Sequence, residues 1–230
     1  SPDWQQEDAY HHSAGDHYLL WEGNIGTGIT GDDIHGPSFM FTAFRNRWSG
    51  RDGTKTQQTN AVHLYSYNRF WNVVGNVLGT VGYHTQYAVV AKTTSDSASN
   101  ADRSVINLNY SGNQGGNVSS IPNDLNVSSS LLLWGNYDTV NAANRFVVAE
   151  VPSGISVHAN PVPASQTLPA SFFLSSKPTW WGNTPWPSIG PDVTGGTGPG
   201  GHSYDNPASA CYSSSPIDSN YGLSNHVLLF

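Results

Sequence analysis

The sequence has few charged residues, and this scarcity excludes several classes of protein. Asp, Glu, Lys and Arg make up 11% of the 230 residues, far below the roughly 25% of an average soluble domain. The nine Lys and Arg residues form no basic run, and the net charge is −7. Because phosphate binding needs a basic face, we expect no nucleic-acid partner. No apolar run approaches the ~20 residues of a membrane span, so none is expected.

Cysteine and helical periodicity are also nearly absent. Cys211 is the single cysteine, so this chain cannot form an internal disulfide. Ala, Leu, Glu and Lys show no 3.6-residue period. Short runs rich in Val, Leu, Phe, Tyr and Trp alternate instead with Gly, Asn and Ser stretches, which predicts an all-β chain. Abundant hydroxyl, amide and aromatic side chains favour a secreted or cell-surface protein that faces carbohydrate.

Five similar segments indicate an internal repeat. Each is an apolar run followed by an asparagine: LLWEGN, FTAFRN, WNVVGN, LNYSGN and LLLWGN, which end at Asn24, Asn46, Asn76, Asn113 and Asn136. The successive spacings are 22, 30, 37 and 23 residues. The short spacings fit one coil of a parallel β-solenoid, and the long ones fit coils that carry loops at 51–60 and 82–103.

The repeated asparagine has a physical explanation in such a solenoid. Asn tolerates the left-handed backbone that sharp corners need, and its amide can bond to the Asn of the next coil, which predicts an asparagine ladder. The alternative is that Asn simply marks turns, as it does in any β protein.

The composition changes near Val151. Many prolines interrupt regular ladders from that point, and a Gly-rich stretch, GGTGPGGHSYDNPASACY, follows them. We therefore expect parallel β-helix coils over 1–150 and, over 151–230, an irregular segment that packs on the same solenoid and caps it.

Several stretches resemble secreted bacterial proteins of the pectate-lyase-like, right-handed parallel β-helix family. They are LLWEGNIGTGITGDDIHG, FRNRWSG, VHLYSYNRFWNVVGNVLGTVGYHT, LPASFFLSSKPTWWGNTPWPSIGPDV and NPASACY. The resemblance implies the C-terminal portion of a right-handed parallel β-helix, with further coils before it. It implies no settled activity, because fold alone does not determine function.

The densest group of polar residues is GDDIHG. If this stretch is a strand, Asp33 and His35 share one face and Asp32 takes the other. Such groups can hold a cation or act as acid and base, and adjacent Asp residues resemble the acidic pairs of β-helix glycosidases. The alternative is a solvated turn at Gly31-Asp32-Asp33.

Three histidines lie at similar distances before their asparagines. His12, His35 and His63 precede Asn24, Asn46 and Asn76 by 12, 11 and 13 residues. We expect them on one face of successive coils, where they could hold a divalent metal such as Ca²⁺ or bind an acidic sugar. The alternative is coincidence among nine histidines.

The remaining candidates are basic and aromatic. Arg45 could neutralise a uronate carboxylate in lyase chemistry, or it could be an exposed corner residue. Tyr65 and Tyr67 are expected on the same face as His63, and together with His84 they are candidates for a sugar-binding shelf or a base site. Trp180, Trp181 and Trp186 are expected to anchor the C-terminal segment rather than to bind sugar.

Two functions from different classes follow. The first is an extracellular lyase or glycoside hydrolase acting on an acidic polysaccharide, with Asp32, Asp33, His35, His63 and Arg45 as catalytic candidates. The second is a non-catalytic solenoid that binds carbohydrate or serves as an assembly unit. In the second case an N-terminal partner segment or head-to-tail self-association would cover the open edge of the first coil.

Overall fold

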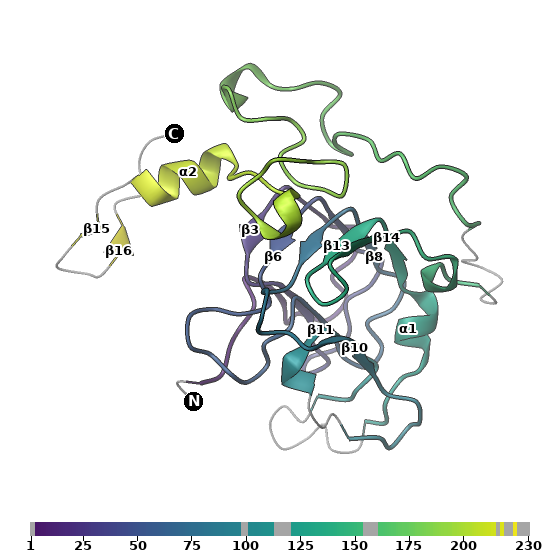
Figure 1. Ribbon diagram of the computed structural model, residues 1–230. Helices are drawn as coiled ribbons and strands as arrows, with labels where there is room; N and C mark the ends of the chain where they lie inside the picture. The colour runs from purple at the N-terminus through teal and green to yellow at the C-terminus, as the bar shows by residue number, and fades with distance from the viewer. Residues whose placement is uncertain are drawn as a thin grey trace.

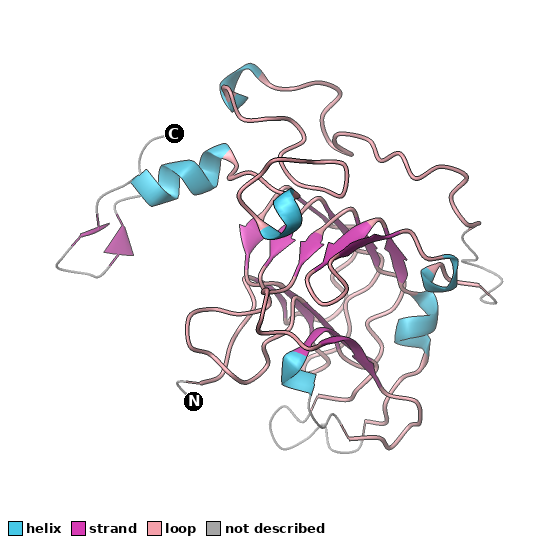
Figure 2. Cartoon of the chain, viewed as in Figure 1, coloured by secondary structure: helices cyan, strands magenta, loops and turns pink. Residues whose placement is uncertain are grey.

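Three sheets of short strands form the centre of the computed structural model (Figures 1 and 2). The structure describes residues 3–97, 101–112, 121–153 and 161–214, together with the backbone of 217–218 and 223–224. Sheet 1 contains, in spatial order, β1 (Ala9–His11), β4 (Ile29–Gly31), β7 (Val62–Leu64), β11 (Ser104–Leu108) and β10 (Gln86–Val90). Sheet 2 contains β12 (Leu132–Trp134), β8 (Asn72–Val74), β5 (Thr42–Phe44) and β2 (Leu20–Glu22). Sheet 3 contains β14 (Ala143–Arg145), β13 (Asn136–Asp138), β9 (Val77–Leu78), β6 (Arg47–Trp48) and β3 (Ile25–Gly26).

The chain visits these sheets in rotation. β1, β2 and β3 enter sheets 1, 2 and 3 in turn, and β4 to β6 and β7 to β9 repeat that order. Every described pair in the three sheets is parallel except β13–β14, which is antiparallel. This confirms the prediction of an all-β chain.

Helices are short in the described part of the chain. They are α1 (Asn126–Ser130), α2 (Pro207–Ser214) and the 3₁₀ turns η1 (Ala101–Arg103), η2 (Val148–Glu150), η3 (Thr179–Trp181) and η4 (Pro199–Gly201). β15 (Ile217–Asp218) and β16 (Leu223–Ser224) pair antiparallel beyond α2. None of the described helices is long and apolar enough to cross a membrane.

The hydrophobic core lies between the sheets and is built from rows of residues in register. In sheet 1 the fully buried Ile29 pairs with Val62, and Val62 pairs with Ile106. In sheet 2, Ala43 and Val73 form an equivalent row. A strand of two or three residues buries little by itself, so stacking these rows is what makes a continuous core.

Four of the predicted asparagines form a ladder at the corner between sheets 2 and 3. The Oδ1 atom of Asn46 accepts the backbone N–H and the Nδ2–H of Asn24, both at 2.9 Å. Asn76 accepts the same pair from Asn46 at 2.8 and 2.9 Å, and Asn136 accepts it from Asn76 at 2.9 and 3.0 Å. The ladder prediction is therefore confirmed for these four residues.

The predicted repeat is wrong in one place. Asn113 lies outside the described residues, and the ladder passes directly from Asn76 to Asn136, 60 residues later. The apolar run before Asn113 is β11, which belongs to sheet 1 and not to the sheet that carries the other apolar runs. The predicted loop at 82–103 contains β10, which pairs with β11, whereas residues 51–60 do connect β6 to β7 without a strand.

The left-handed position of each corner is the residue before the asparagine, not the asparagine itself. Gly23, Gly75 and Gly135 have φ angles of +74°, +65° and +67°, and Arg45 has +52°. Glycine adopts this region without steric penalty, so Arg45 is the strained member of the series.

The segment after residue 161 runs past the side that carries β3, β6, β13 and β14 (Figure 1). Side-chain hydrogen bonds attach it there: Asn144 donates to the carbonyl of Pro191 at 2.9 Å, and Arg47 pairs with Asp205 at 2.8 Å. α2 extends away from the sheets and buries none of its residues (Figure 1).

Candidate functional site

The outer face of sheet 1 gathers several of the predicted site residues. Tyr10 pairs with Thr30, Thr30 with His63, and His63 with Asn107, so these four side chains form one row. Beyond the strands, Asp32 N–H donates to His11 O at 3.1 Å and continues the same register. Because side chains alternate along a strand, Tyr10, His12 and Asp32 emerge on this same face.

His12, Asp32, His35 and Tyr10 form a group that we call the imidazole corner. The Asp32 carboxylate is fully buried and accepts hydrogen bonds from the Nδ1–H of His12 and from the Tyr10 hydroxyl, the latter at 2.7 Å. The ring of His35 lies 4.5 Å from that of His12, centroid to centroid, at 74°. The His12 side chain is 43% exposed. A buried carboxylate therefore fixes one ring nitrogen of a histidine whose ring reaches solvent.

Of the two alternatives left open for residues 32–35, the strand is wrong. β4 ends at Gly31, and residues 33–35 form a bend. Asp32 precedes the bend and bonds to His12, whereas Asp33 lies in the bend and accepts the Gly112 N–H. The turn alternative describes the backbone better, but this turn is not solvated, because Asp32 and Asp33 are 0% and 4% exposed.

Two buried carboxyls adjoin the corner. Asp33 accepts the Gly112 N–H at 3.2 Å, and burial, reinforced by the charge of Asp32, raises the pKa of Asp33 to about 6. Glu7 accepts a hydrogen bond from Gln58 at 3.1 Å, and burial raises the pKa of Glu7 to about 7. Burial and the hydrogen bond to Asp32 raise the pKa of Tyr10 well above its usual range. Losing water favours the neutral form of each acid.

Replacing Glu7 with glutamine is expected to stabilise the protein more at pH 8 than at pH 4. The folded state keeps the Glu7 proton to a higher pH than the unfolded state does. Stability therefore falls as pH rises from the ordinary pKa of 4.5 to about 7. Glutamine has no such pH-dependent penalty. The free energy of unfolding of the variant, relative to that of the wild type, should therefore increase by up to about 3 kcal/mol between pH 4 and pH 8.

Urea denaturation of both proteins at pH 4 and pH 8 measures this difference. The comparison has to be made between variant and wild type, because burial also lowers the pKa of His63 to about 3 and gives that residue the opposite slope. Asp33→Asn should likewise become more stable relative to the wild type as pH rises, but between the ordinary pKa of 3.8 and about 6. A difference between Glu7→Gln and wild type that does not change with pH would contradict the prediction.

A groove of about 550 Å³ lies on the same side of sheet 1, and we call it the amide groove after Gln57, Gln58, Asn60 and Asn107 in its lining. His63 and Tyr65, two predicted residues, also line it, and their rings stack at 4.0 Å. Asn107 Nδ2 lies 3.0 Å from His63 Nε2, and Tyr65 donates to Gln58 at 3.2 Å. The groove therefore combines amides with aromatic rings, as in sites that bind polyhydroxyl ligands.

The amide groove and the imidazole corner are neighbours. Gln58 bonds both to Tyr65 in the groove and to Glu7. Gly112, which donates to Asp33, follows Ser111, a residue that lines the groove. Glu7 and Asp33, which adjoin the corner, therefore link it to residues of the groove.

The other predicted site residues lie elsewhere. Tyr67 has a left-handed backbone, with φ +69°, and its ring lies against Arg69. His84 is buried, accepts from Thr80 N–H at 2.8 Å and lies 3.0 Å from Thr59 O, so it ties two loops together. Arg45 is 2% exposed, which rules out the exposed-corner alternative, and its guanidinium contacts the C-terminal segment.

Metal binding receives no support from the described residues. Among the described residues there is no group of three or more His, Cys, Asp or Glu side chains that could hold a metal ion. The sequence interpretation also missed Tyr10, Glu7 and Gln58. Strand alternation could have found Tyr10, two residues before His12, whereas Glu7 and Gln58 meet only through folding.

Comparison with known proteins does not identify a family for this chain. The chain matches no protein-family model, no curated protein and no solved structure. The resemblance to pectate-lyase-like proteins therefore stays a prediction.

Proposed function

We propose that the chain belongs to an extracellular polysaccharide lyase built on a right-handed parallel β-helix, with β-elimination at the imidazole corner. Two features support the β-helix: the rotation of the chain through three parallel sheets, and the four-residue asparagine ladder. In this proposal the amide groove holds the polysaccharide chain beside the corner.

One observation carries the lyase proposal: the buried Asp32 holds Nδ1 of the partly exposed His12. A carboxylate at Nδ1 fixes the tautomer in which Nε2 is free to accept a proton. A uronate unit offers an acidic proton on the carbon next to its carboxyl group, and such a proton is what a positioned base removes.

The bond changes follow from this geometry. His12 Nε2 takes the proton, the C–H electron pair forms the new C=C bond, and the bond from the β-carbon to the glycosidic oxygen breaks. That oxygen leaves with its electron pair and takes a proton from water or from imidazolium. His35, whose ring lies beside that of His12, donates a ring N–H hydrogen bond to the uronate carboxylate as negative charge develops on it.

Hydrolysis by the Asp pair is less well supported by the same geometry. Glycoside hydrolysis requires two carboxyl groups that reach the glycosidic bond from either side. Asp32 and Asp33 are both buried, and Asp32 is already bonded to His12, Tyr10 and the Ile34 N–H.

His12→Ala is expected to lower the rate of uronate elimination about 100-fold, because it removes the base. Asp32→Asn should also slow the reaction, because an amide can hold His12 in the wrong tautomer. The test incubates the protein with uronate-containing and neutral polysaccharides, with and without Ca²⁺, and follows unsaturated-product absorbance and reducing ends together. His17→Ala is the matched control, because His17 stacks on Phe39 and takes no part in the corner.

Each other outcome overturns part of the proposal. Reducing ends without absorbance indicate a hydrolase. If folded protein produces neither the absorbance nor new reducing ends, the non-catalytic, carbohydrate-binding alternative is favoured. Equal loss of activity in His17→Ala and His12→Ala contradicts the role of His12 as base.

A further inference from the structure

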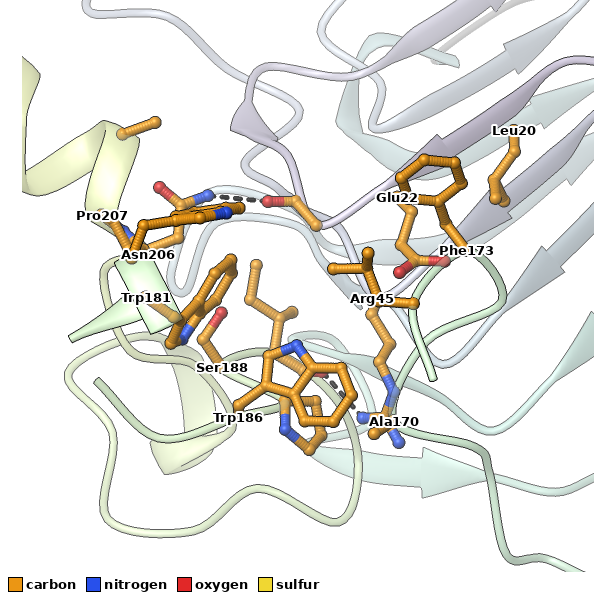
Figure 3. A pocket seen from close by; sticks show the side chains of 16 residues that line it. Leu20, Glu22, Arg45, Ala170, Phe173, Trp181, Trp186, Ser188, Asn206 and Pro207 are labelled. Atoms are coloured by element: carbon orange, nitrogen blue, oxygen red, sulfur yellow. Dashed lines mark hydrogen bonds between the residues drawn. The ribbon is translucent and has the colours of Figure 1, made fainter. Parts of the chain in front are cut away.

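A second hollow, of about 570 Å³, lies between β2 and the C-terminal segment, away from sheet 1. We call it the tryptophan pocket, after Trp180, Trp181 and Trp186 in its lining. Figure 3 shows Trp181 and Trp186 from the C-terminal segment, with Leu20 and Glu22 of β2 also lining the hollow. It shares no lining residue with the amide groove.

The polar groups of this pocket are engaged within the protein. Arg45 pairs with Asp192 at 2.7 and 2.9 Å, and the Asn206 amide donates to Gly23 O at 2.7 Å. The Glu22 carboxylate accepts the Ser171 hydroxyl and the Phe172 N–H. With the guanidinium neutralised by its carboxylate partner, the pocket offers an anionic ligand no free cation.

The aromatic rings, in contrast, are available. Trp180 is 68% exposed and Phe173 is 80% exposed. Trp181 is held in place because its indole N–H donates to Pro185 O at 3.2 Å. The expected anchoring by these tryptophans is thus a poor description of Trp180. Arg45 anchors the segment instead, through the carbonyls of Pro169 and Ile189.

We propose that the tryptophan pocket binds a neutral sugar ring of a polysaccharide. A pyranose has two flat faces of C–H groups that can lie on an indole and a rim of hydroxyls that stay in water, which suits rings at the mouth of an open pocket. The size of the pocket falls within the range of small-ligand sites. A charged sugar is disfavoured in this pocket, because its guanidinium, Arg45, is already paired with Asp192. This site is separate from the imidazole corner and does not depend on lyase activity.

The test titrates the full chain with neutral hexose oligosaccharides of about four to six units by calorimetry, and follows indole N–H signals by NMR. Trp180→Ala and Trp181→Ala are each expected to weaken binding about tenfold or more, because these are the exposed ring and the ring held in place at the pocket. Tyr212→Ala is the control that should leave this binding unchanged, because Tyr212 is an exposed aromatic residue of α2 and lines neither hollow. Trp4→Ala, in the amide groove, tests the alternative location of the sugar. His12→Ala should also bind normally, so the loss of elimination and the loss of binding are distinguishable.

Three results would overturn the proposal. The first is binding that Trp4→Ala abolishes and Trp181→Ala leaves intact, since it would place the sugar in the amide groove. The second is saturable binding of free indole or of a proline-rich peptide with none of the oligosaccharides. The third is the absence of any saccharide binding by protein whose near-ultraviolet circular dichroism matches a folded chain.

Discussion

Replacing Asn76 with alanine is expected to lower the free energy of unfolding by about 4 kcal/mol, through several unsatisfied buried groups. The Asn76 side chain is fully buried and bonds in both directions along the ladder. Its Oδ1 accepts the Asn46 backbone N–H at 2.8 Å, and its Nδ2 donates to Ala43 O and to Asn136 Oδ1, both at 3.0 Å. Alanine leaves the Asn46 N–H and the Ala43 carbonyl without these partners, in a place that water does not reach.

Asn24→Ala is the matched control at the end of the ladder. Asn24 is only half-buried, and its backbone N–H still donates to Asn46 Oδ1 after the side chain is removed. The loss should therefore be about 1 kcal/mol. Urea denaturation monitored by circular dichroism gives both values. Equal losses in the two variants would contradict the idea that ladder bonds stabilise the corner in proportion to their burial.

The ladder shows what could be predicted from the sequence and what could not. An apolar run before an asparagine marks the corner correctly wherever the run belongs to sheet 2, as before Asn24, Asn46, Asn76 and Asn136. The run before Asn113 has the same pattern but enters sheet 1 as β11. A periodicity of apolar residues identifies strands, but it does not say which sheet a strand joins.

The candidate site was predictable only in part, for a related reason. The sequence pointed to GDDIHG and to His12, His35 and His63, and in the structure Asp32, His12 and His35 meet at one corner. Strand alternation could not place Asp33 and His35, because β4 ends at Gly31 and a bend follows. Arg45 was offered as a uronate-binding group, although its guanidinium bonds to residues 123 to 147 positions later in the chain. Local patterns carry no information about such distant contacts.

Arg45→Ala is expected to lower the free energy of unfolding by about 3 kcal/mol and to release the C-terminal segment, because the variant loses the charged hydrogen bonds that hold this segment. The Arg45 side chain is 3% exposed and donates to Pro169 O, Ile189 O and both oxygens of Asp192. These hydrogen bonds and the positive charge of Arg45 outweigh burial and bring the pKa of Asp192 below its usual range. The ion-pair part of the stabilisation is therefore present at neutral pH and lost as pH falls below the ordinary value of 3.8.

Arg45→Gly separates the two contributions of this residue. Both variants lose the guanidinium, but glycine adopts the +52° backbone angle without the steric penalty that alanine keeps. Arg45→Gly should therefore be more stable than Arg45→Ala by about 1 kcal/mol. Limited proteolysis should cut both variants within residues 161–193 faster than the wild type. If alanine were as stable as glycine, the left-handed backbone at this corner would not be strained. If the protease did not distinguish the variants from the wild type, something other than Arg45 would hold the segment against the sheets.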